Sequence, residues 1–118
     1  MFAIAAAVVG GCIVRVPALP DDHSTMPLGH DLHALAGACD DATRVLYLAN
    51  PNNPTGTWFE RSALEDLLAT VPRTTLVVVD EAYQECQLDP DESSALRLLD
   101  RHPNLIVTRT FSKAYALA

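Results

Sequence analysis

The sequence of 118 residues has few basic residues and no long apolar segment. Eight Lys and Arg side chains against fifteen Asp and Glu give a net charge of −7. This balance argues against binding to nucleic acid or to an anionic membrane, because both depend on clustered positive charge. The uncharged stretch before Arg15 is shorter than the roughly 20 residues of a membrane span. Since no Lys or Arg precedes that stretch, it also matches a secretory signal poorly.

Cysteine and glycine are also scarce. The three cysteines, Cys12, Cys39 and Cys86, are an odd number, lie far apart and form no C-x-x-C pair. The sequence therefore argues against a disulfide framework and a thiolate zinc site, and we expect a protein of the reducing cytoplasm. The five glycines include no phosphate-binding P-loop. A nucleotide hydrolase, which the acidic pair Asp80-Glu81 could otherwise indicate, is thus the weakest alternative.

Four short segments rich in branched apolar residues predict β-strands, and the stretches between them have helical spacing of apolar residues. The alternation of strands with helices predicts an α/β fold, with a mostly parallel sheet flanked by helices in three layers. The predicted strands are residues 12–16, 44–49, 75–79 and 104–108, and the predicted helices are residues 2–9, 31–38, 60–71 and 92–99.

Polar segments follow three of these strands, at residues 50–56, 80–83 and 110–113. Because the carboxyl ends of parallel strands meet at one edge, where ligands bind, we expect the three segments to lie side by side. Residues 50–56 are rich in Asn and Pro, so they form either a rigid surface turn or a loop that directs an Asn at a ligand. Either Asn–Pro bond in this loop can be cis.

The acidic pair and the lysine at this edge each have an ordinary and a chemical interpretation. Asp80-Glu81 is a solvated strand end, a metal-holding carboxylate pair or a partner for a cationic ring. Lys113 is the only lysine in the chain. It is either a surface lysine or an amine nucleophile, whose unprotonated form is favoured by apolar neighbours such as those of Lys113. The four histidines are expected in solvated positions, and we assign no metal site to them.

Together these segments resemble the central part of the large domain of class I/II, fold-type-I aminotransferases that depend on pyridoxal 5'-phosphate (PLP). The closest likeness is to the histidinol-phosphate aminotransferases. Three motifs in the family's order and spacing carry it: Asn50-Pro-Asn-Asn-Pro-Thr-Gly56, Val77-Val-Val-Asp-Glu-Ala-Tyr83 and Arg109-Thr-Phe-Ser-Lys-Ala-Tyr-Ala-Leu-Ala118. The resemblance implies that residues 1–118 are a partial PLP-binding large domain, truncated at both ends.

The resemblance also implies a role for each residue that matches the family's motifs. Lys113 would bond covalently to the aldehyde carbon of PLP and then move a proton at the substrate α-carbon. Asp80 would pair with the pyridine nitrogen and favour the protonated ring. Glu81 would make structural hydrogen bonds or face solvent. The other implied contacts are to the ring 3'-oxygen, from Asn53 and Tyr83, and to the phosphate, from Thr110 and Ser112.

The activity implied is PLP-dependent transamination in a cytoplasmic homodimer. The donor would be an amino acid or an amino-alcohol phosphate, most nearly histidinol phosphate, with 2-oxoglutarate as the acceptor in histidine biosynthesis. A related aromatic aminotransferase, an amino-acid phosphate decarboxylase and a non-catalytic fragment are the alternatives. The arginines that the family uses for the phosphate and the substrate carboxylate follow Lys113 beyond this sequence. We therefore expect the isolated chain to have little or no transaminase activity.

Overall fold

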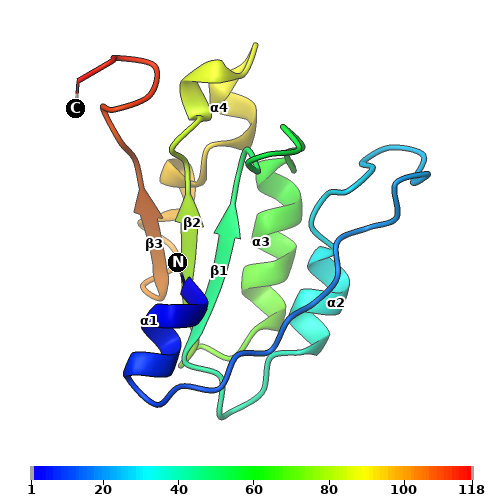
Figure 1. Cartoon of the computed structure of the whole chain (residues 1–118), viewed down its shortest axis with the longest axis vertical. Helices are drawn as coiled ribbons and strands as arrows, with labels where there is room; N and C mark the ends of the chain where they lie inside the picture. The colour runs from blue at the N-terminus through cyan, green and yellow to red at the C-terminus, as the bar shows by residue number, and fades with distance from the viewer. Residues whose placement is uncertain (1, 118) are drawn as a thin grey trace.

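Three parallel strands form one sheet, in the order β1 (Val45–Ala49), β2 (Leu76–Asp80) and β3 (Leu105–Thr108) (Figure 1). The computed structural model describes the backbone of residues 2–117 and the side chains of residues 4–117. Met1 and Ala118, the last residue of the third motif, lie outside the described residues. The strands predicted at 44–49, 75–79 and 104–108 are confirmed to within one residue.

Three of the predicted helices are confirmed with shorter bounds. They are α1 (Phe2–Val8), α2 (Leu32–Gly37) and α3 (Arg61–Thr70). The carboxylate of Asp31 accepts a hydrogen bond from the backbone N–H of Ala34 at 2.9 Å, and this cap fixes the start of α2. Within residues 2–117, no helix is both long and apolar enough to cross a membrane.

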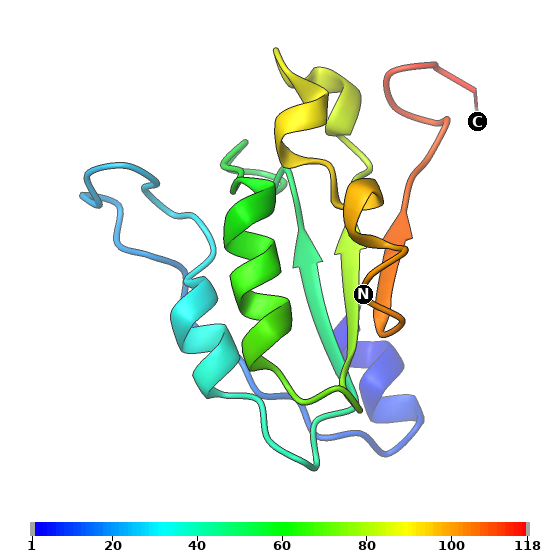
Figure 2. The same ribbon diagram turned by 180° about the vertical axis from the view of Figure 1, so that it is seen from behind.

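The core lies between the sheet and α3. Alternate residues of each strand point toward α3 because side chains of a strand alternate between its two faces. Figures 1 and 2 show α3 on one face of the sheet and α1 on the other, near the start of the strands. On this second face, Val45 and Ile106 are 57% and 41% exposed. The largest buried apolar side chains of the core are Leu46, Leu48, Phe59, Leu64, Leu67, Leu68, Val71, Val77, Val79, Leu98 and Leu105.

The strand predicted at residues 12–16 is wrong. These residues have no regular structure, and the Val14 side chain is 71% exposed. An extended apolar segment becomes a strand only when a neighbour satisfies its backbone hydrogen bonds. In the part of the chain that the structure describes, the sheet contains only β1, β2 and β3, so residues 12–16 have no such neighbour.

The single helix predicted at residues 92–99 is also wrong. The structure has two short pieces instead, α4 (Pro90–Ser93) and the 3-10 helix η2 (Ala95–Leu98). Ser94 separates them with an extended backbone (ψ 124°), and its hydroxyl accepts a hydrogen bond from the N–H of Leu96. A serine hydroxyl that binds the backbone in this way competes with helix continuation. Another 3-10 helix, η1 (Gln84–Cys86), follows β2.

Candidate active site at the carboxyl ends of the strands

The register of the sheet brings the ends of the three strands together. Ala49 pairs with Asp80, and Asp80 pairs with Thr108. Hydrogen bonds continue the pairing beyond the strands, from the N–H of Asn50 to the carbonyl of Asp80 at 3.0 Å and from the N–H of Glu81 to the carbonyl of Thr108 at 2.8 Å. The three polar segments therefore begin at the same edge, as expected (Figure 1).

The loop after β1 is held by the side chain of its first residue. Asn50 is fully buried; its amide donates to the carbonyl of Phe59 at 3.0 Å and accepts from the N–H of Phe59 at 2.9 Å. Both Asn–Pro bonds of the loop are cis, and Gly56 has a φ of 69°, a value that favours glycine. The loop is thus an ordered structure that presents Asn53 at the strand ends.

Asn53, Asp80 and Tyr83 line one small pocket with a volume of about 250 Å³, slightly below the roughly 300–1,000 Å³ of ligand-binding clefts. The side-chain amide of Asn53 donates a hydrogen bond to the Tyr83 hydroxyl at 3.2 Å. Three of the predicted site residues, contributed by two segments that are 30 residues apart, therefore lie together.

The carboxylate of Asp80 is fixed through both of its oxygens. Oδ1 accepts a hydrogen bond from the N–H of Ala82 at 3.0 Å, and Oδ2 accepts one from the Tyr47 hydroxyl. Burial, followed by the hydrogen bond and the charge of Asp80, raises the pKa of Tyr47 well above its ordinary value. The phenol therefore remains protonated and donates.

Tyr47 was not identified as a site residue from the sequence. Its position could have indicated a site residue, because Tyr47 is the only polar side chain within β1 and lies two residues before the end of that strand. Side chains two residues apart share one face of a sheet, so Tyr47 shares the face of Ala49 and, through their pairing, of Asp80.

Glu81 does not line this pocket and lies in the interior of the protein. Its side chain is fully buried, and its Oε2 accepts hydrogen bonds from Nε and Nη2 of Arg109 at 2.9 and 2.7 Å. Its Oε1 accepts from the N–H of Ala95 at 2.5 Å. This carboxylate joins the end of β2 to the start of η2 and to the residue after β3. The expectation that Glu81 makes structural hydrogen bonds is confirmed.

Lys113 lies in an exposed segment after β3. Its ammonium nitrogen is 5.5 Å from the centre of the Tyr83 ring, a cation–π distance. The expected apolar surrounding is wrong for the residues that the structure describes: Lys113 is exposed, as is its neighbour Phe111. Apolar neighbours in sequence bury a side chain only when they pack over it, and here the Phe111 and Tyr115 rings pack on each other and stay exposed.

Thr110 and Ser112 are close to each other. Their hydroxyl oxygens are 2.6 Å apart, and the N–H of Ser112 donates to the Thr110 hydroxyl at 3.1 Å. They form a tight turn between the anchored Arg109 and Lys113. Neither is among the residues that line the pocket of Asp80.

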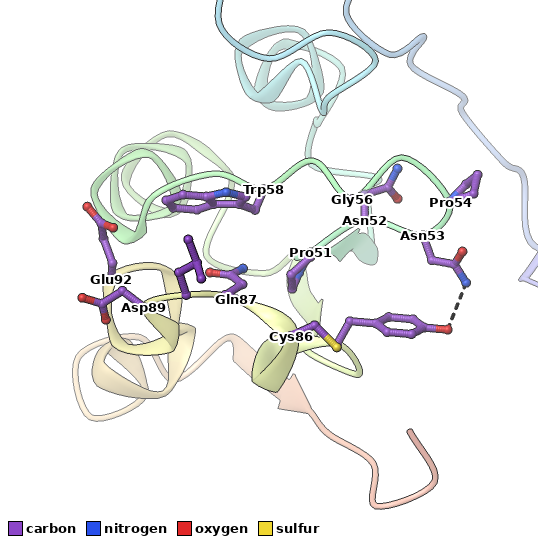
Figure 3. A pocket seen from close by; sticks show the side chains of 12 residues that line it. Pro51, Asn52, Asn53, Pro54, Gly56, Trp58, Cys86, Gln87, Asp89 and Glu92 are labelled. Carbon is purple, nitrogen blue, oxygen red and sulfur yellow. Dashed lines mark hydrogen bonds between the residues drawn. The ribbon is translucent and has the colours of Figure 1, made fainter. Parts of the chain in front are cut away.

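A larger pocket of about 590 Å³, which the sequence did not predict, adjoins the small one. The two share Pro51, Asn52, Asn53 and Tyr83. Figure 3 shows the larger pocket extending from Asn53 to an end where Trp58 lies near Asp89 and Glu92. Trp58 is 38% exposed, so an aromatic surface and carboxylates are available there.

His30 supports the base of the loop. Its Nε2 lies 3.0 Å from the carbonyl oxygen of Ala49, to which the neutral ring donates, and its ring meets that of Phe59 edge to face. Burial lowers the pKa of His30, more than the Ala49 hydrogen bond raises it. The expectation that all histidines are solvated is therefore wrong for His30.

A family model described as aminotransferase class I and II matches residues 1–118. Histidinol-phosphate aminotransferase 2 of Pseudomonas aeruginosa is 59% identical over 90 residues, which are 76% of this chain and 24% of that protein. The corresponding protein of Hydrogenovibrio crunogenus is 45% identical over 118 residues, which are 100% of this chain and 30% of that protein.

An aromatic amino acid aminotransferase of Streptomyces avermitilis is also similar, with 47% identity over 111 residues, 94% of this chain and 29% of that protein. Among solved structures, histidinol-phosphate aminotransferase from Sinorhizobium meliloti in complex with pyridoxal-5'-phosphate superposes with a TM-score of 0.75. It has 37% sequence identity, over 98% of this chain and 30% of that one. The chain thus spans 24% to 30% of the length of these curated relatives.

Proposed function

The chain belongs to the class I and II aminotransferase family, and we propose from this membership that it forms the cofactor-binding part of a PLP-dependent aminotransferase. In this proposal residues 1–118 are a partial large domain. The observation that carries the proposal is the shared pocket of Asn53, Asp80 and Tyr83, with the Lys113 ammonium 5.5 Å from the Tyr83 ring. These are the residues that the three sequence motifs single out.

The donor set of the pocket fits PLP. A carboxylate whose two oxygens are already oriented suits a protonated pyridine nitrogen, and an amide beside a phenol suits an adjacent ring oxygen. We therefore assign the ring nitrogen to Asp80. The other assignments are the ring 3'-oxygen to Asn53 and Tyr83, the phosphate to Thr110 and Ser112, and the covalent bond to Lys113.

When bound, PLP supplies an electron sink for the carbanion at the substrate α-carbon. The chain's own residues bind, orient and transfer protons. Asp80 would hold a proton at the ring nitrogen, and the Tyr83 ring face, 5.5 Å from the Lys113 ammonium, would orient that side chain. Lys113 would move a proton at the substrate α-carbon.

The proposed reaction is transfer of the amino group of histidinol phosphate to 2-oxoglutarate, a step of histidine biosynthesis. Relatives with that name at 45% and 59% identity support it. An aromatic aminotransferase is the second candidate, because a relative of that name is 47% identical over 94% of the chain. For the whole enzyme we propose a homodimer. A cytoplasmic location is supported by the three free cysteines.

Covalent trapping tests the proposal. The protein is incubated with PLP, reduced with borohydride, digested and analysed by mass spectrometry. We expect a pyridoxyl group on Lys113, the only lysine in the chain, and none at that position in Lys113→Arg. Circular dichroism establishes that both proteins are folded. A folded wild-type protein without the adduct contradicts the proposal.

The substrate is tested separately by following glutamate formation or consumption with histidinol phosphate and with phenylalanine as donors. A preference for histidinol phosphate by the enzyme of full family length supports the first reaction, and a preference for phenylalanine supports the second. We expect little or no turnover by residues 1–118 alone.

A further inference from the structure

Tyr47, on strand β1, contacts the acidic group of the candidate site. It lies on β1 opposite Val78, one pleat before the Ala49–Asp80 pair, so that Tyr47 and Asp80 are diagonal neighbours on one face. Long and aromatic side chains reach across such a diagonal. Its hydroxyl donates to Asp80 Oδ2 on the side of the carboxylate opposite the Ala82 N–H.

We propose that Tyr47 is a positioning residue, which fixes the Asp80 carboxylate in the orientation that binds the ring nitrogen of PLP. This inference rests on the proposed function and adds a residue that the motifs do not contain. Without the phenol, one oxygen of Asp80 keeps its bond to the backbone and the other loses its protein donor. The carboxylate can then rotate, and part of the binding free energy must be used to hold it.

The surroundings of Tyr47 suit a permanent donor. Tyr47 and Asp80 both line the small pocket together with Asn53 and Tyr83. Burial and the neighbouring carboxylate raise the pKa of Tyr47, so its hydroxyl stays protonated through the neutral range. A phenol in this state can donate to Asp80 but cannot replace it as the charged partner of a cationic ring.

Binding of PLP to the protein, followed by absorbance and fluorescence titration, tests the inference without any turnover. Tyr47→Phe keeps the ring and removes only the hydroxyl. We expect this variant to bind PLP about tenfold more weakly than wild type. Tyr115→Phe is the matched control, because the Tyr115 hydroxyl contacts Glu85 at 3.4 Å and lies outside both pockets; it should bind like wild type.

Two further measurements separate positioning from simple packing. In an Asp80→Asn background, Tyr47→Phe should change the affinity by about twofold or less, because its effect passes through the carboxylate. The same small effect is expected in the wild-type background for the 1-deaza analogue of PLP, in which a C–H replaces the ring nitrogen. A tenfold loss of affinity that persists in either case overturns the inference and assigns Tyr47 to packing. Unchanged PLP affinity in Tyr47→Phe also overturns the inference.

The contact itself is tested without cofactor by the ultraviolet absorbance of ionised tyrosine as the pH is raised. Asp80→Asn should lower the pKa of Tyr47, which is identified by subtracting the titration of Tyr47→Phe; no change would remove the basis of the inference. A folded wild-type protein that binds no PLP refutes the proposed function and, with it, this role. PLP binding that is insensitive to Tyr47 refutes only the inference.

Discussion

The two sides of the candidate site are attached to the sheet in different ways. On the Asp80 side, hydrogen bonds of buried side chains fix each segment. Asn50 holds the loop after β1, and Glu81 holds the turn after β2. On the Lys113 side, the chain after Arg109 is largely exposed, with the Phe111 and Tyr115 rings packed on each other at 5.6 Å. Stability and chemistry should therefore respond separately to substitution, since the first side contributes to the fold and the second does not.

The largest loss of stability is expected from Arg109→Met. This change leaves the fully buried Glu81 carboxylate without its cation. Breaking a buried pair costs 3–5 kcal/mol, and because the Arg109 side chain is 37% exposed we expect the lower end, about 3 kcal/mol in the free energy of unfolding. Urea unfolding followed by circular dichroism measures it.

The control for that experiment is Arg101→Met. Arg101 pairs with Glu65 at 2.6 Å, but the two side chains are 59% and 40% exposed. Exposed pairs contribute at most about 1 kcal/mol. Equal losses in the two variants would show that burial of Glu81 does not distinguish the pairs.

The second largest effect is expected from Asn50→Ala. The N–H and carbonyl of Phe59, both held by the Asn50 amide, would lose their partner inside the protein. Unpaired buried polar groups cost about 1–3 kcal/mol each, and we expect the free energy of unfolding to fall by about 2 kcal/mol. Asn52→Ala, which removes an exposed bond to Thr55, is the matched control and should be nearly neutral. A neutral Asn50→Ala would mean that the loop is not held by this side chain.

A smaller, pH-dependent effect is expected at His30. Because burial lowers the pKa of His30 in the folded protein, the unfolded chain takes up the proton at a higher pH, near 6.5. The contribution of neutral His30 is complete above that value and is lost as the pH falls from 6.5 toward the lower folded pKa. Over this window the free energy of unfolding should decrease more steeply in wild type than in His30→Gln. Identical slopes would exclude His30 as the cause, and His33→Gln provides the comparison with an exposed histidine.

The smallest effect on stability is expected from Lys113→Ala, because the side chain is exposed and its described contact is with the face of Tyr83. Its thermal midpoint should equal that of wild type, while trapping of PLP at position 113 is abolished. A clearly lowered midpoint would show that the Lys113 segment supports the fold and would remove the contrast between the two sides.

The sequence predicted what depends on local pattern. Branched apolar runs at 44–49, 75–79 and 104–108 form strands, and three polar segments meet where those strands end. It failed where the outcome depends on distant partners. The run at 12–16 has the same composition but no neighbouring strand among the described residues, and Ser94 interrupts a helical pattern because its hydroxyl caps η2.

Among the site residues, too, those in local motifs could be predicted and those that depend on distant partners could not. Asn53, Asp80 and Tyr83 could be selected because their motifs are recognisable in sequence, and the pocket contains all three. Tyr47 could not, since its contact with Asp80 spans 33 positions and depends on strand register. The exposure of Lys113 could not be predicted either, because the sequence does not show whether its apolar neighbours pack over it.

Asp80 and Glu81 are adjacent acids with opposite surroundings, one in the pocket and one in the interior. Their separation arises from the two-residue pleat of β2, so the loss of a single residue within Leu76–Asp80 would exchange the directions in which the two acids point. Insertions and deletions should thus be excluded from this strand in related genes, yet tolerated in the mostly exposed loop at residues 21–25.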